Sequence, residues 1–249
     1  MMEIKNWVAS FLTIKTFGLL IKKWFKSVIP FYEAKINVSN EAIDPSVVAQ
    51  IFWRIYESGE IRFIKKYLER NKPVIELGSS IGAVSSIIGT IKDSGSSLYC
   101  FEANPSLITS IHNNLEINRV SGYTVFNGAI APKGLNVINF HIGKTNLSSK
   151  ISLDRGGIDV PAININDFIY ERKISDYNLV CDIEGAEIFL LFEQREVFEK
   201  SSTIIIELHS CEYQNREYSV EQINEEILKI EGISLKDRYG HVFVYSTLQ

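Results

Sequence analysis

Val74-Ile-Glu76-Leu-Gly78-Ser-Ser-Ile-Gly82 is the stretch that decides the fold of this 249-residue chain. In it an apolar run leads into a turn with two glycines and then into a helical pattern near Ala83 to Ile91. Glycine lets the backbone approach a ligand closely, and the N-terminus of the next helix attracts polar groups. We therefore predict a strand over Val74 to Leu77 and a binding loop after it. The ligand contacts that we expect come from Glu76, Gly78, Ser79 and Gly82.

From Lys72-Pro73 onward, short apolar runs alternate with helical patterns, which is typical of a parallel sheet covered by helices on both faces. The further strands that we expect are Ser97 to Phe101, Tyr123 to Asn127, Leu179 to Asp182 and Thr203 to His209. The further helices are Pro105 to Asn118, Ala186 to Phe192 and Val220 to Ile230. Two last strands, Ile233 to Lys236 and His241 to Tyr245, flank Asp237-Arg-Tyr-Gly240 and predict a hairpin.

The amino-terminal segment carries an apolar residue every three or four positions from Met1 to about Tyr32, which predicts an amphipathic helix with lysines on its other side. Those lysines interrupt the run before the roughly 18 apolar residues that a membrane span needs. No small-residue cleavage site follows, so a secretory signal is not expected either. The helix either packs on the domain or on a second subunit as a homodimer contact, or lies peripherally in a membrane interface.

Asp44-Pro45 predicts a helix start, with an N-cap followed by proline at the first helical position. The helix should run over Val47 to Tyr56 and end at Ser58-Gly59, and a second helix should follow over Glu60 to Glu69. We accordingly divide the chain into a helical N-terminal extension, residues 1–58, and one main domain, residues 59–249.

The composition narrows the classes of partner. A formal net charge of −4 and a pI near 5.7 argue against a nucleic-acid substrate, because affinity for phosphate backbones comes from lysine and arginine. Three cysteines, two of them inside apolar runs, suit reduced thiols in the cytoplasm. No Cys or His spacing typical of zinc is present. We expect a cytoplasmic protein, with a peripheral position at the cytoplasmic membrane face as the alternative.

Glu102 follows the next predicted strand, where a nucleotide-binding sheet places an acid that accepts hydrogen bonds from both ribose hydroxyls. Ala103 comes next to it. Asn127-Gly128-Ala129 ends the third strand at the same sheet edge, where small residues leave room for an adenine ring. A dinucleotide-binding loop would read GxGxxG, and Gly78 has no second glycine two residues on. The spacing therefore favours a different nucleoside cofactor over a nicotinamide.

Asp182-Ile-Glu184-Gly-Ala-Glu187 places three carboxylates at the carboxyl end of the fourth strand, where ligands of open α/β sheets bind. On the fifth strand, the two-residue period puts Glu207 and His209 on one face. A buried unpaired carboxylate is costly, so these acids should hold an ammonium, a sulfonium, a metal or a substrate hydroxyl.

Three blocks together resemble the FkbM family of methyltransferases: Phe101-Glu-Ala-Asn-Pro105, Asp182-Ile-Glu-Gly-Ala-Glu187 and Ile206-Glu-Leu-His209. The resemblance implies a Rossmann-like class I methyltransferase with a seven-stranded, mostly parallel sheet, S-adenosyl-L-methionine as cofactor, and methyl transfer to oxygen, commonly on sugars or glycosylated products. The chain departs from the pattern at Glu76-Leu-Gly-Ser-Ser80, where Asp-x-Gly-Ala-Asn is expected, and at Val180, where a lysine is frequent.

On this reading His209 is the general base, because its intrinsic pKa is near neutrality, and Asp182 or Glu184 receives the proton or orients the acceptor. Asp182 also belongs to the cofactor-binding set, with the loop residues, Glu102, Ala103 and Asn127 to Ala129. We assign no metal ligand, although Asp182, Glu184 and a neighbouring acid could hold a divalent ion. The alternatives are a non-catalytic S-adenosylmethionine-binding subunit and a nicotinamide-dependent oxidoreductase. The polar loop Gly143 to Ser149 is expected to lie over the site, and the acceptor is a small molecule or glycan.

Overall fold

A seven-stranded sheet forms the centre of the computed structural model, which describes residues 15–141, 150–151 and 157–247. The strand order is β14-β15-β11-β10-β3-β4-β5, and only β15 runs antiparallel to its neighbours. The strands are β3 (Val74–Leu77), β4 (Leu98–Glu102), β5 (Tyr123–Asn127), β10 (Tyr177–Cys181), β11 (Ser201–Glu207), β14 (Ile233–Tyr239) and β15 (Val242–Thr247). The predicted α/β fold with a seven-stranded, mostly parallel sheet is confirmed.

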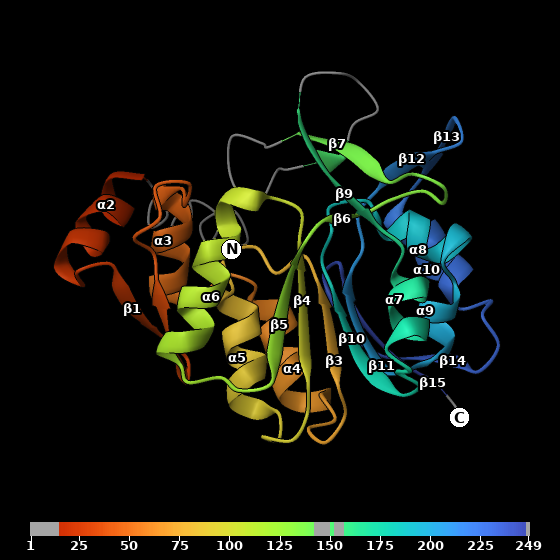
Figure 1. Ribbon diagram of the computed structural model, residues 1–249, viewed down its shortest axis with the longest axis horizontal. Coiled ribbons are helices and arrows are strands. Elements are labelled where there is room, and N and C mark those ends of the chain that lie inside the picture. Colours follow the sequence, from red (N-terminus) through yellow and green to blue (C-terminus); the bar gives the residue numbers. More distant parts are fainter. Residues whose placement is uncertain (1–14, 142–149, 152–156, 248–249) are drawn as a thin grey trace, which may run out of the picture.

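Two helical layers cover the faces of this sheet (Figure 1). On one face lie α4 (Ser58–Tyr67), α5 (Ala83–Ile91) and α6 (Ile108–Ile117), which follows the short 3-10 helix η1 (Pro105–Leu107). On the other lie α7 (Ile165–Glu171), α8 (Glu187–Glu193), α9 (Glu196–Glu199) and α10 (Val220–Ile227). Alternate strand residues divide accordingly, because successive side chains point to opposite faces. Val180 and Ile205 join the first core, whereas Leu179 and Ile204 join the second.

The N-terminal region is partly helical and partly a hairpin. Helix α2 (Lys15–Trp24) is followed by β1 (Val28–Phe31) and β2 (Ala34–Asn37), which pair antiparallel. The predicted N-terminal helix is present, but its predicted extent to about Tyr32 is wrong. The helix ends because Lys26 and Ser27 adopt left-handed conformations, with φ of 50° and 64°, and the N–H of Ser27 donates to the carbonyl of Lys22. Pro30, inside β1, could not continue a helix either. Residues 1–14 lie outside the described part.

Helix α3 (Pro45–Trp53) begins as predicted, since the Asp44 carboxylate accepts hydrogen bonds from the backbone N–H and the hydroxyl of Ser46. It ends earlier than predicted, at a left-handed Arg54 that caps the carbonyls of the last turn. Ser58 then starts α4 instead of ending α3, so that boundary prediction is wrong. The predicted turn Asp237 to Gly240 is also too long, because β14 continues to Tyr239.

The contacts of α2 use only part of its apolar stripe. Gly18 and Ile21 are buried, and Gly18 packs against the backbone of Pro45 at the start of α3. Trp24 is 84% exposed and Leu20 64% exposed. The predicted contact with a membrane or a second subunit stays a prediction. No helix in the described ranges is long and apolar enough to cross a membrane.

Between β5 and β10 the chain builds a small second sheet of order β6-β9-β7-β8 above the main one (Figure 1). Its strands are β6 (Ala129–Ile130), β7 (Val137–His141), β8 (Lys150–Ile151) and β9 (Ile158–Ile163), and a separate hairpin pairs β12 (Cys211–Tyr213) with β13 (Arg216–Tyr218). The small sheet has its own apolar cluster around Ile138, Phe140 and Val160. The predicted covering loop Gly143 to Ser149 lies outside the described residues.

Replacing Gly18 with Ala tests the packing of the N-terminal helix. A Cβ atom there would fall 1.7 Å from the Pro45 carbonyl oxygen, so α2 must move away from α3. We expect a loss of about 1–3 kcal/mol in unfolding free energy, although helix propensity alone favours Ala by about 1 kcal/mol. Urea unfolding measures this free energy. The exposed Leu19→Ala serves as control, and its unfolding free energy should stay within about 0.5 kcal/mol of wild type. A Gly18→Ala protein as stable as wild type would contradict this packing.

Candidate active site

The loop between β3 and α5 is built on two left-handed glycines. Gly78 has φ of 89° and Gly82 has φ of 80°, both in the region that favours glycine. A Cβ on Gly78 would fall 1.8 Å from the Asp182 carbonyl oxygen, and one on Gly82 would fall 2.8 Å from Cα of Ile111. The loop therefore lies directly against the end of β10 on one side and α6 on the other.

Glu76 supports this loop from below. Its carboxylate accepts hydrogen bonds from the hydroxyls of Ser79, at 3.0 Å, and Ser85, at 2.5 Å. The side chain is 1% exposed, and burial raises its pKa. Glu76 is not among the residues that line the neighbouring cleft, so its position suits ordering of the loop, while Ser79 itself reaches the cleft.

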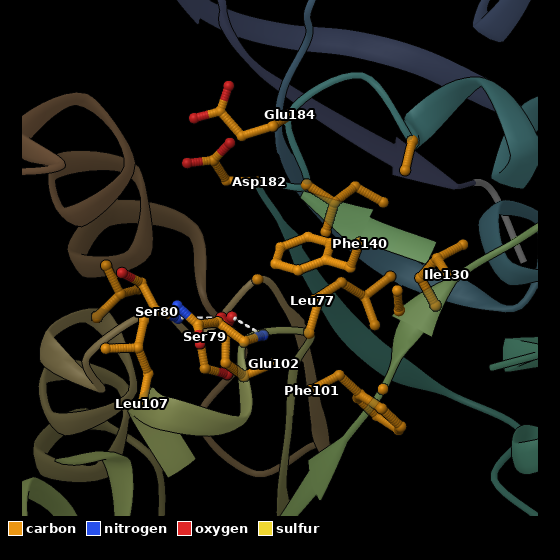
Figure 2. A pocket seen from close by; sticks show the side chains of 18 of the residues that line it. Leu77, Ser79, Ser80, Phe101, Glu102, Leu107, Ile130, Phe140, Asp182 and Glu184 are labelled. Carbon is orange, nitrogen blue, oxygen red and sulfur yellow. Dashed lines mark hydrogen bonds between the residues drawn. The ribbon is translucent and has the colours of Figure 1, made fainter. Parts of the chain in front are cut away.

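We call the cleft above the loop the inner cleft; its space, including the open mouth, amounts to about 900 Å³. Figure 2 shows apolar side chains along one wall and carboxylates at its upper end, where Asp182 and Glu184 lie. The apolar wall consists of Leu77, Val84, Phe101, Leu107, Ile130 and Phe140. One half of the cleft therefore suits a flat apolar group, and the other a cationic one.

Glu102 lies on the floor of the inner cleft at the end of β4 (Figure 2). Its two carboxylate oxygens accept hydrogen bonds from the backbone N–H groups of Ser80 and Asn104, each at 2.7 Å. Burial raises the pKa of Glu102 to about 7, against the opposing effect of these amides. The carboxylate is thus fixed in place by the loop on one side and by its own strand end on the other.

The neighbouring strand end supplies small residues. Gly128 and Ala129 line the inner cleft, and so does Ala103. Asn127 does not line it; its amide donates to the carbonyls of Glu102 and Ala103, at 2.9 and 3.0 Å, and so ties β5 to β4. Asn127 therefore shapes the floor of the cleft from behind.

Glu187 organises the turn after β10. Its buried carboxylate accepts hydrogen bonds from the backbone N–H groups of Ile183, at 3.1 Å, and Gly185, at 2.9 Å. The oxygen that accepts from Ile183, Oε1, also lies 3.1 Å from Nδ1 of His209. Glu184 stands between these amides with φ of 53°, a backbone conformation that persists only where surroundings enforce it. Glu187 thus holds the acid turn and the histidine in one arrangement.

His209 is surrounded by negative charge. Its Nε2 lies 3.8 Å from Oδ1 of Asp182 and 3.7 Å from Oε2 of Glu184. Burial lowers the pKa of His209, but the hydrogen bond to Glu187 and the surrounding carboxylates outweigh that effect and raise it to about 9. The imidazole is therefore mostly protonated at neutral pH in the protein without ligands.

A second hollow, which we call the acidic cleft, adjoins the inner cleft and shares Glu57, Glu60, Asp182 and Glu184 with it. Its polar lining also includes Gln50, Ser58, Glu207, His209, Tyr239 and His241, and no lysine or arginine is among the described residues around it. Burial raises the pKa of Glu57 to about 7 and those of Glu60 and Asp182 well above the ordinary carboxyl value, with mutual repulsion adding to each. Among the described lining residues, the positive charge that faces these carboxylates is therefore the protonated imidazole of His209.

The structure brings most of the predicted site residues to one place. Gly78, Ser79, Glu102, Ala103, Gly128, Ala129, Asp182 and Glu184 line the inner cleft, and His209 lines the acidic cleft. Glu76, Gly82 and Asn127 support these surfaces from outside. Sequence analysis missed Tyr56, Glu57, Glu60 and Phe140. Glu60 left a signal, since it shares the apolar face of α4 with Phe63 and Ile64, where a carboxylate is costly.

Comparison with known proteins identifies the family of this chain as one of methyltransferases. Residues 76–240 match the family described as Methyltransferase FkbM domain, so the chain belongs to this family. No curated protein matches. Similar solved structures include TYW2 of M. jannaschii in complex with AdoMet, with 14% identity, 89% of this chain and 86% of that chain covered, and a TM-score of 0.45. A putative O-methyltransferase from Klebsiella pneumoniae has 10% identity, coverages of 77% and 80%, and a TM-score of 0.46.

Replacing Glu187 with Gln tests the electrostatics of this site. In chelator-treated wild type, the His209 imidazole should titrate near pH 9 by NMR. Glu187→Gln should lower the midpoint clearly, because the hydrogen bond to a charged carboxylate is lost and burial then opposes the imidazolium with less compensation. Glu184→Gln, which removes a carboxylate at 3.7 Å instead of 3.1 Å, should lower it less.

The same shift sets the sign of a stability effect. A folded-state pKa above the unfolded value of 6.5 adds stability that is complete below pH 6.5 and is lost as pH rises through about 9. This decline should be smaller in Glu187→Gln. A wild-type midpoint near 6.5 would refute the arrangement around His209.

Proposed function

We propose that this member of the FkbM methyltransferase family binds S-adenosyl-L-methionine in the inner cleft and methylates a hydroxyl of a sugar or glycosylated product. The observation that carries the proposal is the division of the inner cleft into an apolar wall, a fixed carboxylate at Glu102 and an acidic end at Asp182. These three parts match an adenine ring, a ribose diol and a cationic methionine moiety. The residues present therefore fit the cofactor.

Each part of the chain has a separate task in this proposal. Glu102 accepts hydrogen bonds from the ribose hydroxyls, and Gly128 and Ala129 leave space for the adenine beside Ile130 and Phe140. Asp182 offers negative charge to the ammonium and sulfonium groups. The bound cofactor supplies an electrophilic methyl group. The chain's contribution to the reaction is largely alignment, because in-line displacement depends on the geometry of approach.

The acceptor would enter through the acidic cleft, which meets the inner cleft at Asp182 and Glu184. Carboxylates suit hydroxyl donors, so this lining favours a polyhydroxylated acceptor. His209 faces the same junction and is the proposed base. Its high pKa without ligands means that it must lose its proton before it can act, and positive charge brought in by the cofactor favours that loss. Asp182 or Glu184 orients the acceptor hydroxyl.

Replacing Glu102 with Gln tests cofactor binding. Removing a charged acceptor should weaken S-adenosylmethionine affinity by about 10- to 100-fold, since such bonds contribute about 1.5–3 kcal/mol. Wild-type affinity should rise with pH until Glu102 ionises near pH 7 and then level off, whereas Glu102→Gln should show less dependence. Calorimetry measures the affinity and its dependence on pH. The exposed Glu116→Gln serves as the control variant, and NADH serves as a ligand that we expect not to bind. Wild type that does not bind S-adenosylmethionine would refute the proposal.

Replacing His209 with Gln tests the chemical role. We expect cofactor affinity within about threefold of wild type and a turnover lower by about 100-fold or more, as for loss of a general base. A labelled methyl donor incubated with fractionated glycans identifies the acceptor and gives the rate. Unchanged turnover would remove His209 as base. Tight cofactor binding with no methylated product in any fraction would instead favour a non-catalytic cofactor-binding subunit.

A further inference from the structure

The acidic cleft contains carboxylates from three separate parts of the chain. Glu57 lies at the start of α4, Asp182 follows β10, and Glu207 ends β11. One oxygen from each of these residues can be chosen so that all three lie within 4.8 Å of one another. Ligands around a Mg²⁺, Mn²⁺ or Ca²⁺ ion stand about 2.0–2.6 Å from it and hence no more than about twice that distance apart. The three oxygens therefore fit one coordination shell.

Glu60 provides independent evidence that this cleft binds a ligand. It is only 4% exposed and lines both the acidic and the inner cleft. Within the described ranges, no hydrogen bond or ion pair reaches its carboxylate. Oδ1 of Asp182 is likewise buried and accepts no hydrogen bond in this part of the chain. Oδ1 of Asp182 faces Nε2 of His209 at 3.8 Å, too far for a hydrogen bond. A buried carboxylate without a hydrogen bond is costly, so Glu60 and Asp182 can each accept a donor or a cation.

The neighbouring acid Glu187 shows what a satisfied carboxylate looks like here. Both of its oxygens accept backbone N–H groups, and one also contacts His209. Asp182, Glu187 and His209 also lie close enough to share an ion, but both oxygens of Glu187 already accept hydrogen bonds from the protein. In the described part of the chain, Glu57 and Glu207 accept no hydrogen bond, and Asp182 faces His209 only at 3.8 Å. An ion would therefore bind on the side of Asp182 that faces α4.

We propose that Glu57, Asp182 and Glu207 bind one divalent cation of the Mg²⁺ or Mn²⁺ type, with Glu60 as a further ligand or as acceptor for a metal-bound water. The donor set is entirely carboxylate oxygen, which hard cations prefer. A divalent ion offsets the mutual repulsion of these carboxylates better than a single ammonium group does. The site concerns ion binding alone and depends neither on the cofactor nor on the acceptor.

Such an ion would stand where the two clefts meet. A hydroxyl that enters the acidic cleft could then bind the cation directly, which lowers the pKa of the hydroxyl. Asp182 would link the ion to the inner cleft.

Binding of Mn²⁺ to chelator-stripped protein, without cofactor, tests the site. Electron paramagnetic resonance should show about one Mn²⁺ bound per chain, and Mg²⁺ should displace it. Because the ion binds the folded state, the midpoint of thermal unfolding should rise with its concentration. Glu57→Gln and Glu207→Gln should each weaken binding at least tenfold, while the exposed Glu225→Gln keeps wild-type affinity.

A second measurement separates loss of the ion site from loss of the fold. Without metal, Glu57→Gln should be at least as stable as wild type, since it removes repulsion with Glu60 and Asp182. The proposal is overturned if Mn²⁺ does not bind, or if it binds equally well to Glu57→Gln and Glu207→Gln. Glu102→Gln should bind Mn²⁺ normally, so a failure of the cofactor proposal is distinguishable from a failure of this one.

Discussion

The close approach of Gly78 to the carbonyl oxygen of Asp182 is the constraint on which the site depends. A Cβ atom at position 78 would lie 1.8 Å from that oxygen, so only glycine lets the loop cross the end of β10 there. The backbone N–H of Asp182 donates to Leu77 and that of Gly78 to Phe101, so β3 is joined to both neighbours at this level. Chain connections lead away from β3 in opposite directions at this point, which creates the crevice where ligands of such sheets bind.

Burial of the acids around that crevice has two different outcomes. Glu187 is stabilised by two backbone amides and the imidazole, and it therefore holds the turn in which Glu184 adopts its left-handed conformation. Glu57 and Glu60 have no comparable support, and Asp182 retains an unsatisfied oxygen. A buried polar group that is fully bonded stabilises the fold, whereas an unsatisfied one costs free energy. This contrast separates the acid that builds the site from those available to ligands.

The sequence predicted the central sheet well, because its buried strands are short apolar runs bounded by Gly, Pro and Asp, and because the acids stand directly after those runs. The N-terminal hairpin was missed since Phe25 and Val28 continue a helical spacing, and only the backbone restriction at Pro30 contradicts it. The side chain of Phe140 was beyond prediction, since its place over the inner cleft depends on how β7 pairs with β9 in a separate sheet. Pairing between distant segments leaves no local periodic signal.

The N-terminal region completes the site. The family match begins at Glu76, yet Tyr56, Glu57 and Glu60 line the clefts, and the hydroxyl of Tyr56 donates to Ser80 in the loop after β3. The opposite wall of the acidic cleft comes from the β14–β15 turn near Gly240, at the far end of the sheet. The inner cleft is therefore made mainly by the family domain, whereas the acidic cleft joins it to segments at its margins. Any preference for an acceptor that this cleft imposes must depend on those marginal segments as much as on the shared core.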